Sequence, residues 1–175
     1  TVTDEVGNTA TASEIGEIDL TDPTIFIDPL NDTNDTTPTI SGSVLDVPAG
    51  TTVSLLVTDS NGVTQTLTAT TDAQGNWQVD VASELAEGDY TVTASVSDEA
   101  GNTSTATATG TIDLTAPIIN IDTMADSNDT TPTISGTTQG LDAATTVTVS
   151  VTDSAGSTQT FTTITNADGS WSVTV

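Results

Sequence analysis

The chain has 175 residues, of which 25 are Asp or Glu and none is Lys, Arg, His or Cys. Because no cationic side chain can neutralise phosphate, nucleic acid is excluded as a partner, and the lack of Cys excludes disulfides and thiolate metal sites. Carboxylates that come together in the fold must therefore bind metal ions or remain in water. No apolar run approaches the roughly 20 residues that span a bilayer.

One nine-residue segment occurs twice without a change: Asn34–Gly42 returns as Asn128–Gly136, 94 positions later. The surrounding sequence aligns at the same offset without a gap, so the chain is a tandem array. The offset divides it into the C-terminal strands of a preceding repeat, a complete repeat, and the N-terminal part of a following repeat that lacks its last two strands. These parts are residues 1–21, 22–114 and 115–175, and we expect the chain to be a window on a longer array.

Within the complete repeat, apolar and polar residues alternate with the period of two that is typical of half-buried strands. The alternation predicts strands at Thr24–Asp28, Thr39–Val44, Thr52–Thr58, Thr64–Thr70, Asn76–Val81, Tyr90–Ser97 and Thr103–Ile112. Turn residues separate these segments, and helical periodicity is absent. Seven short strands in about 90 residues is the count of an Ig-like sandwich. We therefore predict an all-β fold of tandem Ig-like repeats, each a seven-strand Greek-key β-sandwich.

Two aromatic residues of the complete repeat are interpreted as structural. Trp77 shares one strand face with Val79 and Val81, which favours a core anchor over an exposed platform for sugars. Tyr90 opens the sixth predicted strand, where sandwiches often place a tyrosine that fixes a corner of the fold.

The acidic residues fall mainly on the predicted loops, and only Glu14, Glu17 and Asp80 lie well inside predicted strands. If the strands run up and down, the loops gather at two ends of the sandwich, which we call the upstream and downstream ends. The upstream end carries Asp19 of the linker and the last turn, Asp98-Glu99. The downstream end carries Asp32, Asp35 and the linker residue Asp113, and the following repeat has Asp126 and Asp129 at the positions of Asp32 and Asp35.

Stacked repeats would bring the carboxylates of one end onto those of the next. Two carboxylates about 5 Å apart repel by roughly 3 kcal/mol at an effective dielectric of 20, and no cationic side chain is present to offset this. Ca²⁺ accepts 6–8 oxygen ligands with flexible geometry, whereas Mg²⁺ requires a tight octahedron. We therefore predict Ca²⁺ sites at the junctions. The candidate ligands are Asp19, Asp32, Asp35, Asp98, Glu99, Asp113, Asp126 and Asp129.

Two points weaken this prediction. Acidic loops can serve solubility alone, and the chain contains neither an EF-hand loop nor a glycine-rich Ca²⁺ nonapeptide.

Four motifs resemble those of a known family over the whole chain. They are Asp72-Ala73-Gln74-Gly75-Asn76-Trp77, Leu85-Ala86-Glu87-Gly88-Asp89-Tyr90-Thr91-Val92-Thr93-Ala94, Ser97-Asp98-Glu99-Ala100-Gly101-Asn102-Thr103 and Ile112-Asp113-Leu114-Thr115-Ala116-Pro117. This set is similar to the bacterial Ig-like repeats of giant repetitive adhesins of the RTX type. The resemblance implies type I secretion, an extracellular place on the bacterial surface, and Ca²⁺-stiffened stalks that project a distal binding domain for adhesion or biofilm formation.

The resemblance also implies roles for single residues. Asp19 and Asp113 occupy the linker position, Asp98 the last-turn position, and Asp32 with Asp35 the acidic loop before the second strand. One residue departs from a strict pattern, since Asp72 is replaced by Asn166 in the following repeat. We therefore do not expect Asp72 to be an obligatory ligand.

The leading hypothesis for function is mechanical: a stalk repeat whose partners are the neighbouring repeats of the same chain. The alternative is a Ca²⁺-dependent module that binds glycan or protein. An enzyme is not expected, because the chain lacks His, Lys, Arg and Cys as bases or nucleophiles, and no aromatic-lined cleft accompanies the carboxylates. The incomplete following repeat should leave an unpaired strand edge. We expect that residues 1–17 of a neighbouring molecule can add a strand there, which gives head-to-tail self-association.

Overall fold

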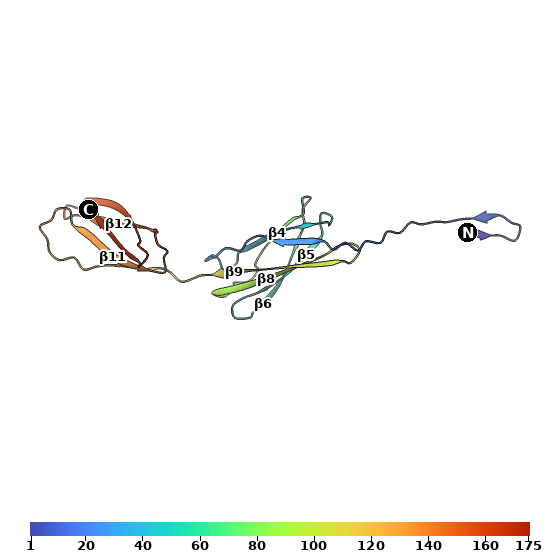
Figure 1. The fold of residues 1–175 in the computed structure, drawn as a ribbon, viewed down its shortest axis with the longest axis horizontal. Coiled ribbons are helices and arrows are strands. Elements are labelled where there is room, and N and C mark those ends of the chain that lie inside the picture. Colours follow the sequence, from blue (N-terminus) through green and yellow to red (C-terminus); the bar gives the residue numbers. More distant parts are fainter. The chain divides into compact units, whose positions relative to one another are not determined.

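The computed structural model describes residues 1–175, and its regular elements are all strands. It divides into two compact units, Thr1–Asp113 and Leu114–Val175 (Figure 1). The structure contains no helix that could span a membrane.

The first unit contains a two-layer antiparallel sandwich. One sheet has the order β3-β4-β7 and the other the order β6-β5-β8-β9. The strands are β3 (Thr24–Ile27), β4 (Thr39–Leu45), β5 (Thr52–Thr58), β6 (Thr64–Thr70), β7 (Asn76–Asp80), β8 (Gly88–Ser97) and β9 (Thr103–Ile112). The predicted all-β, Ig-like architecture is confirmed. The bounds of β5, β6 and β9 agree with the prediction, and the other strands differ by one or two residues at an end.

The core of the sandwich lies between the sheets, where the alternating apolar residues face one another. Val53, Val57 and Val92 of the four-stranded sheet are fully buried against Ile40 of the other sheet. Trp77 is only 3% exposed, so its predicted place in the core is confirmed. Its indole N–H has no hydrogen-bond partner, so the residue contributes through packing.

A glycine lies beneath each large core ring. Gly42 of β4 pairs with Trp77 of β7, and a Cβ on Gly42 would lie 2.5 Å from the indole Cζ2 and would collide with the carbonyl oxygen of Phe26. Tyr90, 2% exposed, covers Gly110 of β9 in the same way, with 2.7 Å between a Cβ at Gly110 and the phenol oxygen. The structural role predicted for Tyr90 is therefore confirmed.

The second unit repeats the first five strands of this sandwich. One sheet has the order β10-β11-β14, and β12 pairs with β13 in the other. The strands are β10 (Ile118–Ile121), β11 (Thr133–Gln139), β12 (Thr146–Thr152), β13 (Thr158–Ile164) and β14 (Ser170–Thr174). Trp171 is buried over Gly136, as Trp77 is over Gly42. The β5 strand has partners on both sides, β6 and β8, whereas β12 pairs with β13 alone.

The segment before the first sandwich forms a short hairpin, β1 (Val2–Thr3) and β2 (Thr9–Ala10), and residues 11–21 form no strand. The expectation that Glu14 and Glu17 lie inside strands is therefore wrong. The equivalent strand, β9, bonds to β8 over ten residues, whereas this segment offers only Val2 and Thr3 as partners. A strand needs such a ladder, because its backbone groups have no partner within the segment.

Candidate metal centre

Five turns between consecutive strands share one hydrogen-bond pattern in which an Asp carboxylate closes the turn. At Asp98, Oδ1 accepts hydrogen bonds from the backbone N–H groups of Gly101 (2.7 Å) and Asn102 (2.8 Å). The glycine has a φ of 95°, a backbone conformation that favours Gly. The same bond, from the N–H four residues further on, closes the turns that begin at Asp4, Asp59, Asp72 and Asp153.

This pattern gives the first Asp of each turn a structural role, because its carboxylate accepts the backbone hydrogen bonds that close the turn. A carboxylate that accepts backbone N–H bonds does so best in its charged form. The Asn102 side-chain amide, which donates to Asp98 Oδ2 at 2.8 Å, is the main reason that the pKa of Asp98 is lowered. Asp98 is therefore ionised at neutral pH. Its three hydrogen bonds use both lone pairs of Oδ1 and one of Oδ2, which leaves one lone pair on Oδ2 for a cation.

At the upstream end, the structure brings Asp19 to the Asp98 turn. The Asn102 side-chain amide also donates to the backbone carbonyl of Asp19, at 3.2 Å. The Asp19 carboxylate accepts the N–H of Thr21 at 2.9 Å, which fixes the direction of the linker. Glu99 is exposed and lines, together with Asp98, an open hollow of about 330 Å³.

At the downstream end, Thr33 joins the acidic loop to the end of β9. Its N–H donates to the carbonyl of Thr111 at 3.1 Å, and its carbonyl accepts the N–H of Asp113 at 2.9 Å. The Thr33 hydroxyl accepts the N–H of Asp35 at 3.0 Å. The loop that carries Asp32 and Asp35 is therefore held beside the linker residue Asp113 by backbone bonds.

The second unit repeats the acidic loop. Asp129 N–H donates to the Ser127 hydroxyl at 3.0 Å, and its carboxylate accepts the N–H of Thr131 at 2.9 Å. Asp126 and Asp129 line a hollow of about 660 Å³ together with Asp122.

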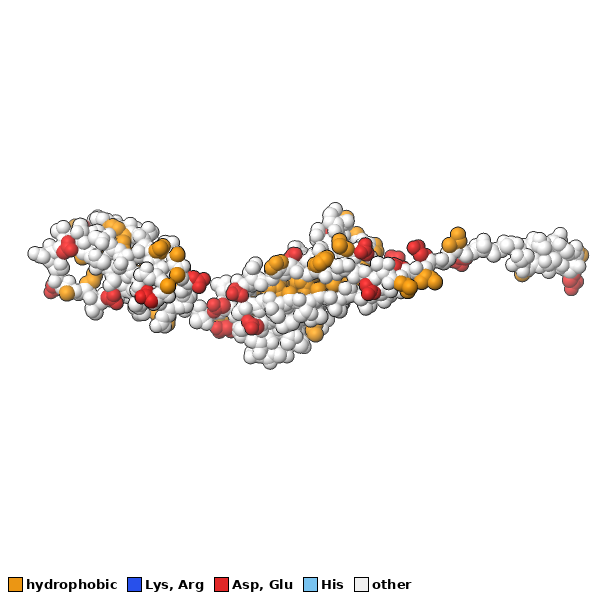
Figure 2. All heavy atoms as spheres, viewed as in Figure 1, with side chains coloured by type: hydrophobic (Ala, Val, Ile, Leu, Met, Phe, Trp, Pro, Cys, Tyr) orange, Lys and Arg blue, Asp and Glu red, His pale blue; other side chains and the backbone are white.

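Acidic side chains gather at the two ends of the first sandwich, while its faces are mostly uncharged (Figure 2). The structure nevertheless brings no three of the Asp and Glu side chains close enough together to hold a metal ion. Asn102 links the backbone of Asp19 to the Asp98 carboxylate, and Thr33 links the acidic loop to the backbone of Asp113. The ligand set at each end stays a prediction, and a complete Ca²⁺ shell would need further oxygens from backbone, water or a neighbouring repeat.

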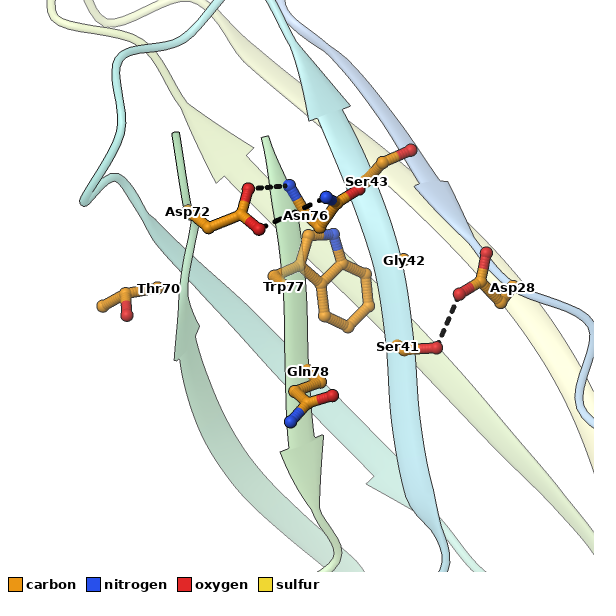
Figure 3. A pocket seen from close by; sticks show the side chains of 9 residues that line it. All are labelled: Asp28, Ser41, Gly42, Ser43, Thr70, Asp72, Asn76, Trp77 and Gln78. Atoms are coloured by element: carbon orange, nitrogen blue, oxygen red, sulfur yellow. Dashed lines mark hydrogen bonds between the residues drawn. The ribbon is translucent and has the colours of Figure 1, made fainter. Parts of the chain in front are cut away.

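A separate hollow of about 670 Å³ lies beside the sheet of β3, β4 and β7. Its two carboxylates, Asp28 and Asp72, lie on opposite sides of it, and each is bonded to a neighbouring side chain, Ser41 and Asn76 respectively (Figure 3). They do not converge on a common point. The structure therefore provides no reason to add either residue to the predicted ligands.

Residues 28–114 match the family model of the bacterial Ig-like domain. This segment, which covers nearly all of the complete repeat, therefore belongs to the bacterial Ig-like domain family. No curated protein matches it.

Solved structures from large bacterial adhesins are similar to the chain. It is 29% identical to a Ca²⁺-stabilised adhesin that helps an Antarctic bacterium reach out and bind ice, with a TM-score of 0.54 over 99% of this chain and 46% of that one. It is 27% identical to part of a 1.5-MDa bacterial ice-binding adhesin, with a TM-score of 0.50 over 87% of this chain and 53% of that one. A tetra-tandem repeat from the extending region of a large adhesion protein is 36% identical, with a TM-score of 0.45 and coverages of 99% and 46%.

The chain thus spans about half the length of these structures. The resemblance to repeats of large bacterial adhesins, inferred from the four sequence motifs, is confirmed. Type I secretion and a role in biofilm formation stay predictions.

Proposed function

We propose that the chain is part of the stalk of a bacterial cell-surface adhesin, in which tandem Ig-like repeats hold a distal binding domain away from the cell. The observation that carries this proposal is the duplicated sandwich: the same strands, with the same tryptophan over the same glycine, recur after 94 residues. Such an array supplies length. The solved structures that support this proposal come from adhesins, and we assign the chain no catalytic role.

We further propose that Ca²⁺ binds at the ends of the repeats and stiffens the junctions. Every charged side chain of the chain is a carboxylate, and oxygen-only donor sets suit a hard cation. The ion would offset the repulsion between facing ends. The similarity to a Ca²⁺-stabilised adhesin supports this choice of ion.

The proposed ligands are those that the two ends carry. Asp19, Asp98 and Glu99 would serve the upstream end, and Asp32, Asp35 and Asp113 the downstream end. Asp126 and Asp129 repeat the downstream pair in the second unit. Seven of these eight side chains are exposed, and Asp98 is partly so, which leaves them open to an ion. Extracellular Ca²⁺ modules bind at about 10⁻⁴–10⁻³ M, so the sites would fill outside the cell.

Small-angle scattering and thermal unfolding of the full chain test whether Ca²⁺ stiffens the junctions. We expect millimolar Ca²⁺ to lengthen the particle and raise its Tm, and EDTA to reverse both changes. NaCl at the same ionic strength is the control, because screening acts on any exposed charges whereas coordination requires the divalent ion. Equal effects of NaCl and Ca²⁺, or no effect of EDTA, would contradict coordination at the junctions.

The alternative, a module that binds glycan or protein, has less support. Sugar sites commonly use exposed Trp or Tyr faces, and Trp77, Trp171 and Tyr90 are each no more than 3% exposed, although Phe26 is 50% exposed. Binding of the chain to a glycan array in Ca²⁺ would favour this alternative.

We also propose that residues 1–17 of a neighbouring molecule can pair with β12, on the side that bonds to no strand within residues 1–175. The equivalent side of β5 bonds to β8 from Val53 to Thr58. Near β12, Ile119 and Ile121 are more than half exposed and line an open hollow of about 300 Å³. Analytical ultracentrifugation over a range of concentrations tests this pairing, and a monomer throughout would contradict it.

A further inference from the structure

One side-chain amide joins the linker to the last turn of the first sandwich. The Nδ2 group of Asn102 lies 2.8 Å from Asp98 Oδ2 and 3.2 Å from the backbone oxygen of Asp19. Asn102 and Asp98 are partly buried, whereas Asp19 is exposed. Asn102 lies 83 residues after Asp19 in the sequence, so this amide connects the linker to a distant turn.

The turn itself does not require an amide at this position. The equivalent residue is Val63 in the Asp59 turn and Ser157 in the Asp153 turn, and both turns keep their backbone N–H bond to the Asp carboxylate, at 2.8 and 2.9 Å. Asn76 bonds to Asp72 at 3.2 Å, and its counterpart in the second unit is Ser170. The amide of Asn102 is therefore dispensable for the turn, and its additional contact is with the linker.

The choice of an amide follows from the charges around it. Asp19, Asp98 and Glu99 repel one another when ionised, and the chain has no Lys, Arg or His that could bridge them. An amide N–H₂ group carries two donors and no charge. It can hold a carboxylate with one donor and a backbone carbonyl with the other, which keeps the linker in place against the repulsion.

We propose that Asn102 is a metal-independent latch, a positioning residue that holds the Asp19 linker against the last turn before any ion binds. This inference rests on the proposed function only for its second consequence, that the Asp19 linker is already held beside the Asp98 turn when Ca²⁺ binds at the upstream end. Loss of the neutral hydrogen bond to the Asp19 carbonyl alone would weaken Ca²⁺ binding at the upstream end by about fivefold.

The latch can be tested in the full chain, which has no Cys and so accepts a labelled pair through Ser13→Cys and Thr66→Cys, both at exposed positions. Single-molecule energy transfer between the labels measures the distance between the linker segment and the sandwich, and how widely that distance varies. We compare Asn102→Ser with Asn76→Ser, because both remove an amide from the same kind of turn but only Asn102 contacts the linker. Thermal unfolding checks that both variants keep the fold.

In EDTA we expect a broader distance distribution for Asn102→Ser and an unchanged one for Asn76→Ser. In a calcium titration we expect Asn102→Ser to bind about fivefold more weakly at the upstream end. Identical distance distributions for the two variants in EDTA would overturn the latch. If the latch holds in EDTA while Ca²⁺ has no effect on the parent chain, the stiffening role of Ca²⁺ fails and the latch stands.

Discussion

Substitution of Gly42 by Ala tests the packing of the sandwich at its tightest point. The new methyl group would lie 2.5 Å from Trp77 Cζ2 and 2.8 Å from Cε2, and it would collide with the carbonyl oxygen of Phe26. Overpacking a core costs about 1–3 kcal/mol. We expect about 3 kcal/mol here, because one obstacle is backbone and cannot rotate away. For a domain of this size, that loss lowers Tm by about 12 °C or more.

Urea and thermal unfolding followed by tryptophan fluorescence measure this cost. In a Trp171→Phe background the remaining Trp77 reports the first unit alone. The control is Gly16→Ala, since a Cβ at Gly16 meets no atom within 4 Å, and we expect it to change the free energy of unfolding by less than about 0.5 kcal/mol. If Gly42→Ala behaves like this control, the close approach of indole and glycine is not a constraint of the fold.

Three further predictions concern charge and packing. Asp98→Asn is expected to weaken Ca²⁺ binding in isothermal titration, whereas Asp72→Asn, which copies the natural Asn166, should leave it unchanged; equal losses would remove Asp98 from the ligand set. The pKa values of Asp72 and Asp98 lie below the usual Asp value of 3.8, so the stability they contribute is complete above that pH and is lost as pH falls through their lower folded values. In EDTA, Tm should therefore decline below about pH 4, and the decline should be smaller in Asp72→Asn; equal pH profiles would contradict this account. Trp171→Ala should lower the free energy of unfolding of the second unit by about 3–5 kcal/mol, so that calorimetry no longer detects a cooperative transition for this unit. An intact transition would contradict a core centred on the Trp171 ring.

Strand positions could be read from the sequence wherever β-branched residues alternate with polar ones. The β5 strand was predicted at Thr52–Thr58 because its inward residues are Val53, Leu55 and Val57, all nearly fully buried. The start of β8 was predicted two residues late, at Tyr90. Gly88 and Asp89 have the composition of a turn, yet they pair with Ile112 and Thr111 of β9. Pairing with β9 therefore determines where β8 begins, and this information is not present in the local sequence of β8.

The candidate site was predictable in part. The ends of the sandwich follow from the strand order, which is why Asp32 and Asp113 could be placed together. The turn-closing role of Asp98 was missed, although the spacing Asp-x-x-Gly at five positions was a signal for it. The contact between Asn102 and Asp19 could not be predicted, because it depends on the path of the linker across the last turn.

A chain with a net charge of −25 and no cationic side chain must find positive partners elsewhere. In this fold they are backbone N–H groups and side-chain amides. The carboxylates of Asp4, Asp72 and Asp98 each accept two backbone N–H bonds and one Asn amide bond, so their charge stabilises a turn. Glu99 follows the turn-closing Asp98, Asp32 precedes Thr33 of the downstream loop, and both carboxylates are exposed. The carboxylates within the turns therefore stabilise the fold. The exposed carboxylates at the ends of the sandwich are the groups that a divalent ion can bind, and such binding would change the stiffness of the junctions.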